Sequence, residues 1–159
     1  MMKASFKTGL SFGLTSGVIT TLGLMVGLHS GTHSRAVVIG GILTIAIADA
    51  MSDALGMHIA EESKNNGVVS EIWESTVATF ASKFLIALTF VVPVLLLPLE
   101  AAMTVSVGWG LTLLTVLSYL LARAQQIPAW KVIVEHVVIG VSVIAITHYV
   151  GGWIHSALG

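Results

Sequence analysis

The sequence contains no cysteine, only three prolines and few charged residues. The absence of cysteine excludes disulfides, thiolate metal sites and cysteine nucleophiles. Charged residues make up 9% of the 159 residues and hydrophobic residues 55%, with a mean hydropathy of +0.95. A single domain of this composition has too little polar surface to face water, which predicts a membrane protein. The formal net charge of -1 and the lack of a basic patch argue against nucleic-acid binding.

Five apolar stretches are each long enough to cross a hydrocarbon core, which takes about 20 helical residues. They lie near residues 8–29, 35–60, 73–97, 101–123 and 128–154. Lys3 and Lys7 precede the first stretch, but it continues without a small-residue cleavage site, so we expect a retained span rather than a removed signal peptide. The short connections leave no room for a soluble domain. The sequence therefore predicts an all-α integral membrane protein with one five-helix domain over residues 1–159.

The cations predict the orientation of these spans. An odd number of spans puts the termini on opposite sides, and most cations then share the side of the N-terminus: Lys3, Lys7, Lys64, Arg123 and Lys131. Arg35 lies on the opposite side and Lys83 within a span. Because lysine and arginine are enriched in cytoplasmic loops, we expect a cytoplasmic N-terminus. The membrane would be the plasma membrane in a prokaryote and an organelle membrane in a eukaryote.

Two aspartates lie one helical turn apart inside the second apolar stretch, at Asp49 and Asp53. A carboxylate near the centre of a bilayer costs roughly 3 kcal/mol on insertion scales, so a pair suggests a pathway for ions or protons. Met57 follows on the same predicted helix face. Carboxylate oxygens suit Mn2+ and Fe2+, and a thioether adds softer character that disfavours Mg2+ and Ca2+. This face predicts a site for a divalent transition metal.

The same aspartates also allow a structural interpretation. Lys83 lies about ten residues into the third span, roughly 15 Å at 1.5 Å per residue, and Asp49 lies at nearly the same depth. The two side chains could neutralise each other as a buried ion pair. One lysine cannot neutralise two aspartates at close range, so one carboxylate would stay free or share a proton. A transport role and a mainly structural network both remain open.

The first span carries a ladder of small residues, with Gly9, Gly13 and Gly17 four residues apart. Such ladders let helix backbones approach closely, which suits either a dimer seam or tight packing against the second span. We expect a homodimer packed through this span, with a pathway at or near the seam. The hydroxyl residues that could complete a metal's coordination shell opposite the aspartates are Thr15, Ser16 and Thr20.

The remaining polar residues offer weaker signals. His29 and His33 have the i, i+4 spacing of a helical metal pair, but they flank what reads as a turn, so we expect at most an ion-attracting mouth on the far side. No Ser-His-Asp ordering, Gly-rich phosphate loop or nucleophile with an adjacent base is present. We therefore expect neither an enzyme nor a permanently bound cofactor.

Two of these segments resemble the vacuolar iron transporter family (VIT type). Thr15-Ser-Gly-Val-Ile-Thr-Thr-Leu-Gly-Leu-Met-Val-Gly27 is similar to its first-helix pattern, Asn-Asp-Gly-Leu-Val-Ser-Thr-x-x-Leu-x-x-Gly. Ala48-Asp-Ala-Met-Ser-Asp-Ala-Leu-Gly56 is similar to its second-helix pattern, Ala-Gly-Ala-x-Ser-Met-x-x-Gly-Glu. Residues 78–93 and 138–151 match its third and fifth helices in shape. The resemblance covers nearly the whole chain.

This resemblance implies a homodimeric transporter that moves Fe2+ or Mn2+ out of the cytosol in exchange for protons. The chain departs from the family, because the family's first-helix aspartate aligns with Ser16, its second-helix methionine with Asp53 and its glutamate with Met57. A family glycine becomes Asp49, so the carboxylates lie on one helix rather than two. Eukaryotic members carry a cytosolic metal-binding extension between the second and third spans. Only a short link stands there in this chain, with four glutamates left to form an entrance: Glu61, Glu62, Glu71 and Glu74.

Two functions therefore stand at this point. The first is a metal-ion transporter with Asp49, Asp53 and Met57 as its core ligands. The second is a divergent membrane protein that has lost transport and keeps the fold as an interaction module, with Asp49 and Lys83 as a structural pair.

Overall fold

The structure is a computed structural model that describes residues 4–64 and 68–158. These residues form six helices and no strand. The helices are α1 (Ala4–Thr32), α2 (Arg35–Ser63), α3 (Val69–Thr89), α4 (Val91–Leu96), α5 (Leu99–Gln125) and α6 (Ala129–Leu158). By length and composition they provide five spans that can cross a membrane, with α3 and α4 together forming the third. The expected multi-pass, all-α architecture is confirmed at this level, and most helices extend a few residues beyond the expected bounds.

The third span is interrupted, which corrects the continuous helix expected over residues 73–97. Helix α3 ends at Thr89 and α4 begins at Val91. Pro93 lacks an N–H, and its ring would clash with the carbonyl of Thr89 four residues earlier in an unbroken helix. The chain instead makes a tighter turn, in which the Phe90 N–H donates to the carbonyl of Ala87 at 3.1 Å. The proline thus sets the position of the break.

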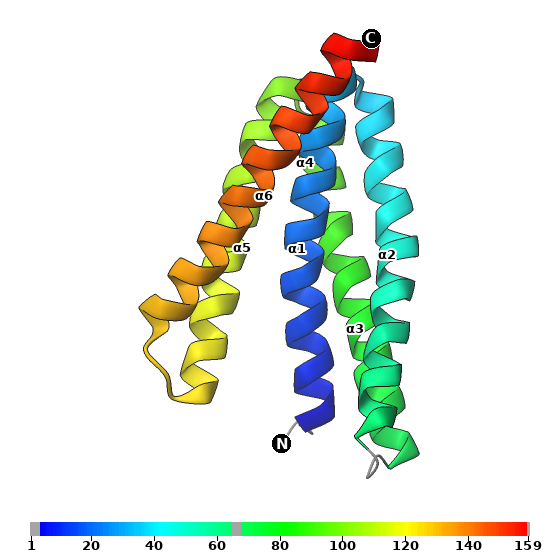
Figure 1. The fold of residues 1–159 in the computed structure, drawn as a ribbon, viewed down its shortest axis with the longest axis vertical. Helices are drawn as coiled ribbons and strands as arrows, with labels where there is room; N and C mark the ends of the chain where they lie inside the picture. The colour runs from blue at the N-terminus through cyan, green and yellow to red at the C-terminus, as the bar shows by residue number, and fades with distance from the viewer. Residues whose placement is uncertain (1–3, 65–67, 159) are drawn as a thin grey trace.

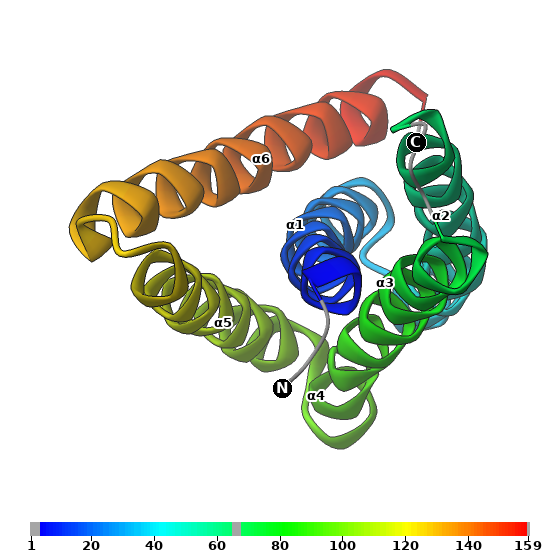
Figure 2. The same ribbon diagram turned by 90° about the horizontal axis from the view of Figure 1, so that it is seen from below.

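Helix α1 stands in the centre of the bundle, and the other helices surround it (Figure 2). Half of its most apolar stretch is buried within the protein, whereas only 6% of the corresponding stretch of α6 is buried. The start of α1, the end of α2, the start of α3 and the α5–α6 connection lie at one end of the bundle, and the end of α6 lies at the other (Figure 1). Helix α1 therefore supplies the surface on which the other spans are assembled.

The glycines of α1 permit this central position. A Cβ at Gly9 would overlap the backbone of Ser75 on α3, and one at Gly13 would overlap the carbonyl of Thr79. In the other half of α1, the backbone at Gly27 lies against Gly151 of α6. Gly9 and Gly13 of the ladder thus contact α3 of the same chain, and the glycines in the other half of α1 contact α6. These contacts put α3 of the same chain on the ladder, where the sequence suggested a dimer seam or the second span.

The first prediction concerns this close approach. Replacing Gly13 by leucine should lower the free energy of unfolding by about 1–3 kcal/mol or more, because the new side chain meets the α3 backbone, which cannot move aside cheaply. Unfolding in mixed micelles, followed by the loss of helical circular dichroism, would measure the change. Gly108→Leu on α5 is the matched control, since nothing lies within 4 Å of a Cβ there. Equal losses in both variants would contradict the assigned packing.

Candidate ion site

Lys83 of α3 lies inside the bundle, and only 2% of it is exposed. Its methylene stem passes Gly17 of α1, where an added Cβ would lie 3.2 Å from the Lys83 Cγ. A buried, unpaired ammonium costs several kcal/mol. The groups around the Lys83 Nζ therefore decide whether this part of the bundle is stable.

Three helices meet at the Lys83 ammonium. Nζ donates hydrogen bonds to Oδ2 of Asp53 on α2 and to Oγ of Ser16 on α1, the latter at 2.9 Å. The Ser16 hydroxyl in turn donates to Asp53 Oδ2 at 2.7 Å. One oxygen of Asp53 thus accepts two hydrogen bonds, one of them from a charged donor. Such charge-assisted bonds are about twice as strong as neutral ones, so this triangle ties α1, α2 and α3 together.

Asp49 is the second carboxylate at this point. Its Oδ2 lies 2.5 Å from the Lys83 Nζ, yet within the described residues the same oxygen accepts no hydrogen bond of normal geometry. The contact is therefore an ion pair without hydrogen-bond alignment, and Coulomb attraction needs no such alignment. The Asp49–Lys83 contact considered from the sequence is present. The contact with Asp53 was not anticipated, although its place one turn further along the same helix face was the signal.

The cluster holds more acidic groups than basic ones. If both carboxyl groups are ionised, they leave one negative charge beside the single ammonium in an apolar bundle. The aspartates are partly open to the outside of the bundle, with 26% of the Asp49 side chain and 21% of the Asp53 side chain exposed. A net charge so placed needs a cation, a proton or a covering partner, because lipid alone cannot solvate it.

The other predicted ligands do not join this network. The Thr20 hydroxyl donates to the carbonyl of Ser16 at 2.9 Å. Thr15 lines a different cavity, of about 520 Å3, between α1 and α5. Met57 is half-buried one turn beyond Asp53 and takes no part in the hydrogen bonds and ion pairs of the described chain. Of the predicted hydroxyl ligands, Ser16 alone hydrogen-bonds to an aspartate.

The donor set is compatible with a hard or intermediate cation. Carboxylate and hydroxyl oxygens suit Mn2+ and Fe2+ as well as Mg2+. Across residues 4–64 and 68–158, no three histidine, aspartate or glutamate side chains come close enough to hold one metal ion. In this arrangement the space between the carboxylates is taken by the lysine nitrogen.

A second polar cluster lies at the end of the bundle that holds the C-terminus. Helix α1 continues through His29, where the sequence predicted a turn, and ends at Thr32. The His29 and His33 rings lie 5.4 Å apart, and His33 lies 5.2 Å from the ring of His155 on α6. His29 Nε2 is 3.4 Å from a carboxylate oxygen of Glu100 on α5. The two predicted histidines are thus neighbours at the end of the bundle away from the N-terminus.

The four predicted entrance glutamates are spread over the end that holds the N-terminus. Glu61 pairs with Lys64 at 2.7 Å on α2. Glu74 of α3 accepts a hydrogen bond from the Ser5 hydroxyl of α1 at 3.4 Å. Glu62 and Glu71 are exposed.

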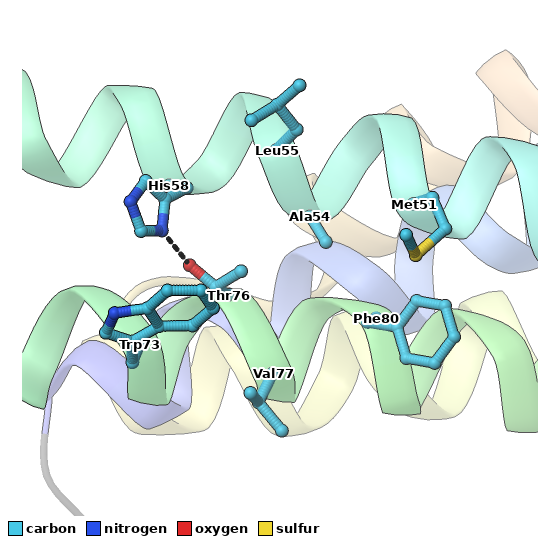
Figure 3. Close-up of a pocket in the computed structure, with 8 residues that line it drawn as sticks. All are labelled: Met51, Ala54, Leu55, His58, Trp73, Thr76, Val77 and Phe80. Carbon is cyan, nitrogen blue, oxygen red and sulfur yellow. Dashed lines mark hydrogen bonds between the residues drawn. The ribbon is translucent and has the colours of Figure 1, made fainter.

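An outer groove of about 350 Å3 runs between α2 and α3 (Figure 3). Met51 and Phe80 lie at one end of it, and His58 lies at the other, where its Nδ1 is 3.1 Å from the Thr76 hydroxyl and its ring meets Trp73 edge-on. Its walls are otherwise apolar. This groove offers no carboxylate to a cation, so the ion site stays with Asp49, Asp53 and Lys83.

Comparison of the chain with protein-family models, with curated proteins and with solved structures gave no match. The resemblance to vacuolar iron transporters therefore stays a prediction from its motifs.

The second prediction tests the energetic role of the aspartates. An Asp49→Asn/Asp53→Asn double variant leaves the Lys83 ammonium buried without an anion, and it should lose about 3–5 kcal/mol of stability. Each single variant should lose less, because the other carboxylate still contacts Nζ. Adding Lys83→Met to the double variant should restore most of the loss. Chemical unfolding in mixed micelles measures all four.

Ser52→Ala is the control, since Ser52 is exposed on the same helix between the two aspartates. A double variant as stable as the Ser52→Ala protein would show that Lys83 does not depend on these carboxylates.

Proposed function

We propose that the protein transports a divalent transition-metal ion, Fe2+ or Mn2+, out of the cytosol in exchange for protons. The observation that carries this proposal is the cluster of Asp49, Asp53, Ser16 and Lys83, which places two carboxyl groups beside a single ammonium in the middle of apolar spans. Intramembrane ionisable groups of this kind mark ion or proton pathways. The metal, the direction and the proton exchange are what the motif resemblance implies.

The proposed path runs along the length of the bundle. The cation bias of the sequence puts the end with the N-terminus in the cytosol. Glu61 and Glu74 belong to that end and would attract a cation. The aspartates form the central step, and His29 and His33 lie at the opposite end, where imidazoles can receive a transition metal.

A second function is favoured by one specific observation. Lys83 is almost fully buried and contacts both aspartates, as expected of a closed structural network. In that case the protein is a membrane interaction module that does not transport. The two functions differ in what the loss of one carboxylate does to ion flux.

We further propose that two copies associate through the outer face of α2. The face is formed by small residues at four-residue spacing, all exposed: Gly40, Thr44, Ala48, Ser52, Gly56 and Ala60. Small residues let two membrane helices approach closely. The outer face of α6 carries bulky residues such as Val138 and Ile146, which suit lipid better. A partner on α2 would also cover the exposed parts of Asp49 and Asp53 next to this stripe.

The third prediction concerns transport. Everted membrane vesicles expose the cytosolic face, so they should accumulate Mn2+ when the wild-type protein is present and a proton gradient is imposed. Asp53→Asn should lower the initial rate at least about tenfold, because asparagine keeps the shape but loses the charge that offsets ion dehydration. The folded state of the variant is checked by gel filtration and circular dichroism.

Glu135→Gln is the control for this experiment, since it removes an exposed carboxylate from α6, outside the proposed path. Wild-type uptake by a folded Asp53→Asn protein would refute the transport role of the site. It would leave the structural network as the function of Lys83.

The fourth prediction concerns the dimer. Gly56→Leu should leave the fold intact, because the position is open, and should lower the dimer fraction about tenfold by separating the α2 helices. Energy transfer between labelled copies, measured against the protein-to-lipid ratio, gives this fraction. Val138→Leu on α6 is the control, since it adds bulk to an exposed face outside the proposed contact. An unchanged dimer fraction in Gly56→Leu would move the interface away from α2.

A further inference from the structure

The Lys83 ammonium holds the position that a metal ion would need at these carboxylates. Its Nζ lies 2.5 Å from Asp49 Oδ2 and is hydrogen-bonded to Asp53 Oδ2. Divalent ions bind carboxylate oxygens at about 2.0–2.6 Å. An ammonium and a metal ion cannot both occupy the position between these two oxygens.

Electrostatic repulsion also disfavours binding of a divalent ion at the two aspartates while the Lys83 ammonium is there. With Lys83 in place the two carboxylates share one ammonium, and with the ammonium moved away both are available to another cation. A divalent ion placed a few ångströms from the ammonium would be repelled in a medium that screens charge poorly. A divalent ion therefore gains the full attraction of both carboxylates only when the ammonium leaves them.

The surroundings of Lys83 fit such a movement. Its four-carbon stem has several rotatable bonds, and Gly17 leaves room for the stem where any larger residue of α1 would press on it. Ser16 offers the ammonium an acceptor that is not a carboxylate, at 2.9 Å. The ammonium can thus give up the aspartates while keeping one hydrogen bond.

We propose that Lys83 is a built-in competitor of the transported cation, which binds Asp49 and Asp53 by displacing the Lys83 ammonium from them. This inference rests on the proposed function. By competing, Lys83 weakens cation binding and so lets the cation leave the membrane centre. Without the ammonium, the two carboxylates would hold a divalent ion tightly.

The test is Mn2+ binding to the purified protein in lipid nanodiscs, followed through the electron spin resonance of free Mn2+. Lys83→Met removes the competing charge and should tighten binding about tenfold or more. Lys83→Arg keeps the charge, and its planar fork can hold carboxylates with two parallel bonds, so binding should weaken about tenfold. Lys131→Met is the matched control, because it removes an exposed lysine charge from α6, which carries neither aspartate.

The outcomes separate the inference from the function on which it rests. A folded Lys83→Met protein with unchanged or weaker Mn2+ binding overturns the competitor role. If Lys83→Met does not fold, Lys83→Arg decides, and unchanged or tighter binding in that variant overturns the role. Wild-type binding that is lost in Asp53→Asn but insensitive to Lys83 leaves the proposed function standing alone. No Mn2+ binding in the wild type or in either Lys83 variant overturns both.

Discussion

The ammonium of Lys83 is the group on which the packing of α1, α2 and α3 depends. A lysine that is 2% exposed inside apolar helices needs anions within contact distance, and α2 supplies them at Asp49 and Asp53. Helix α1 approaches α3 closely at its glycines, and Ser16 of α1 hydrogen-bonds to the same ammonium. Moving α2 by one turn would separate at least one of the two carboxylates from Nζ, because they lie one turn apart. The ion cluster thus fixes the register of three helices that apolar side chains alone would leave free to slide.

Much of the fold is predictable, since a bilayer fixes the length of a span and the five apolar runs match it. The break between α3 and α4 can also be predicted from the sequence, because Pro93 cannot continue a regular helix. The central place of α1 was not, because a glycine ladder indicates close packing without naming the partner. Here the partners are backbones at Ser75 and Gly151, which are themselves small residues without a distinctive pattern. In the sequence, a glycine ladder that packs against helices of its own chain looks the same as one that joins two chains.

The site was predictable in its carboxylates but not in its geometry. A charge pair inside an apolar run can be recognised from one sequence, and the matching depth of Lys83 follows from the helical rise. The rotation of α1 about its axis cannot be derived in this way. That rotation turns Ser16 toward Asp53 and its neighbour Thr15 toward α5. One residue of difference is about 100° around a helix at 3.6 residues per turn, which decides which hydroxyl meets the aspartates.

The same contacts bear on how the bundle could move. Ser16, Asp53 and Lys83 belong to three helices, so weakening the bonds between them loosens α2 from α1 and α3 together. The backbone contacts between α1 and α3 contain no charge and would remain. Helix α2 carries both carboxylates on one rigid element, and its opposite face makes few contacts within the chain. If the occupant of the cluster changes, the contacts that α2 makes through Asp49 and Asp53 therefore change, while the backbone contacts between α1 and α3 do not depend on it.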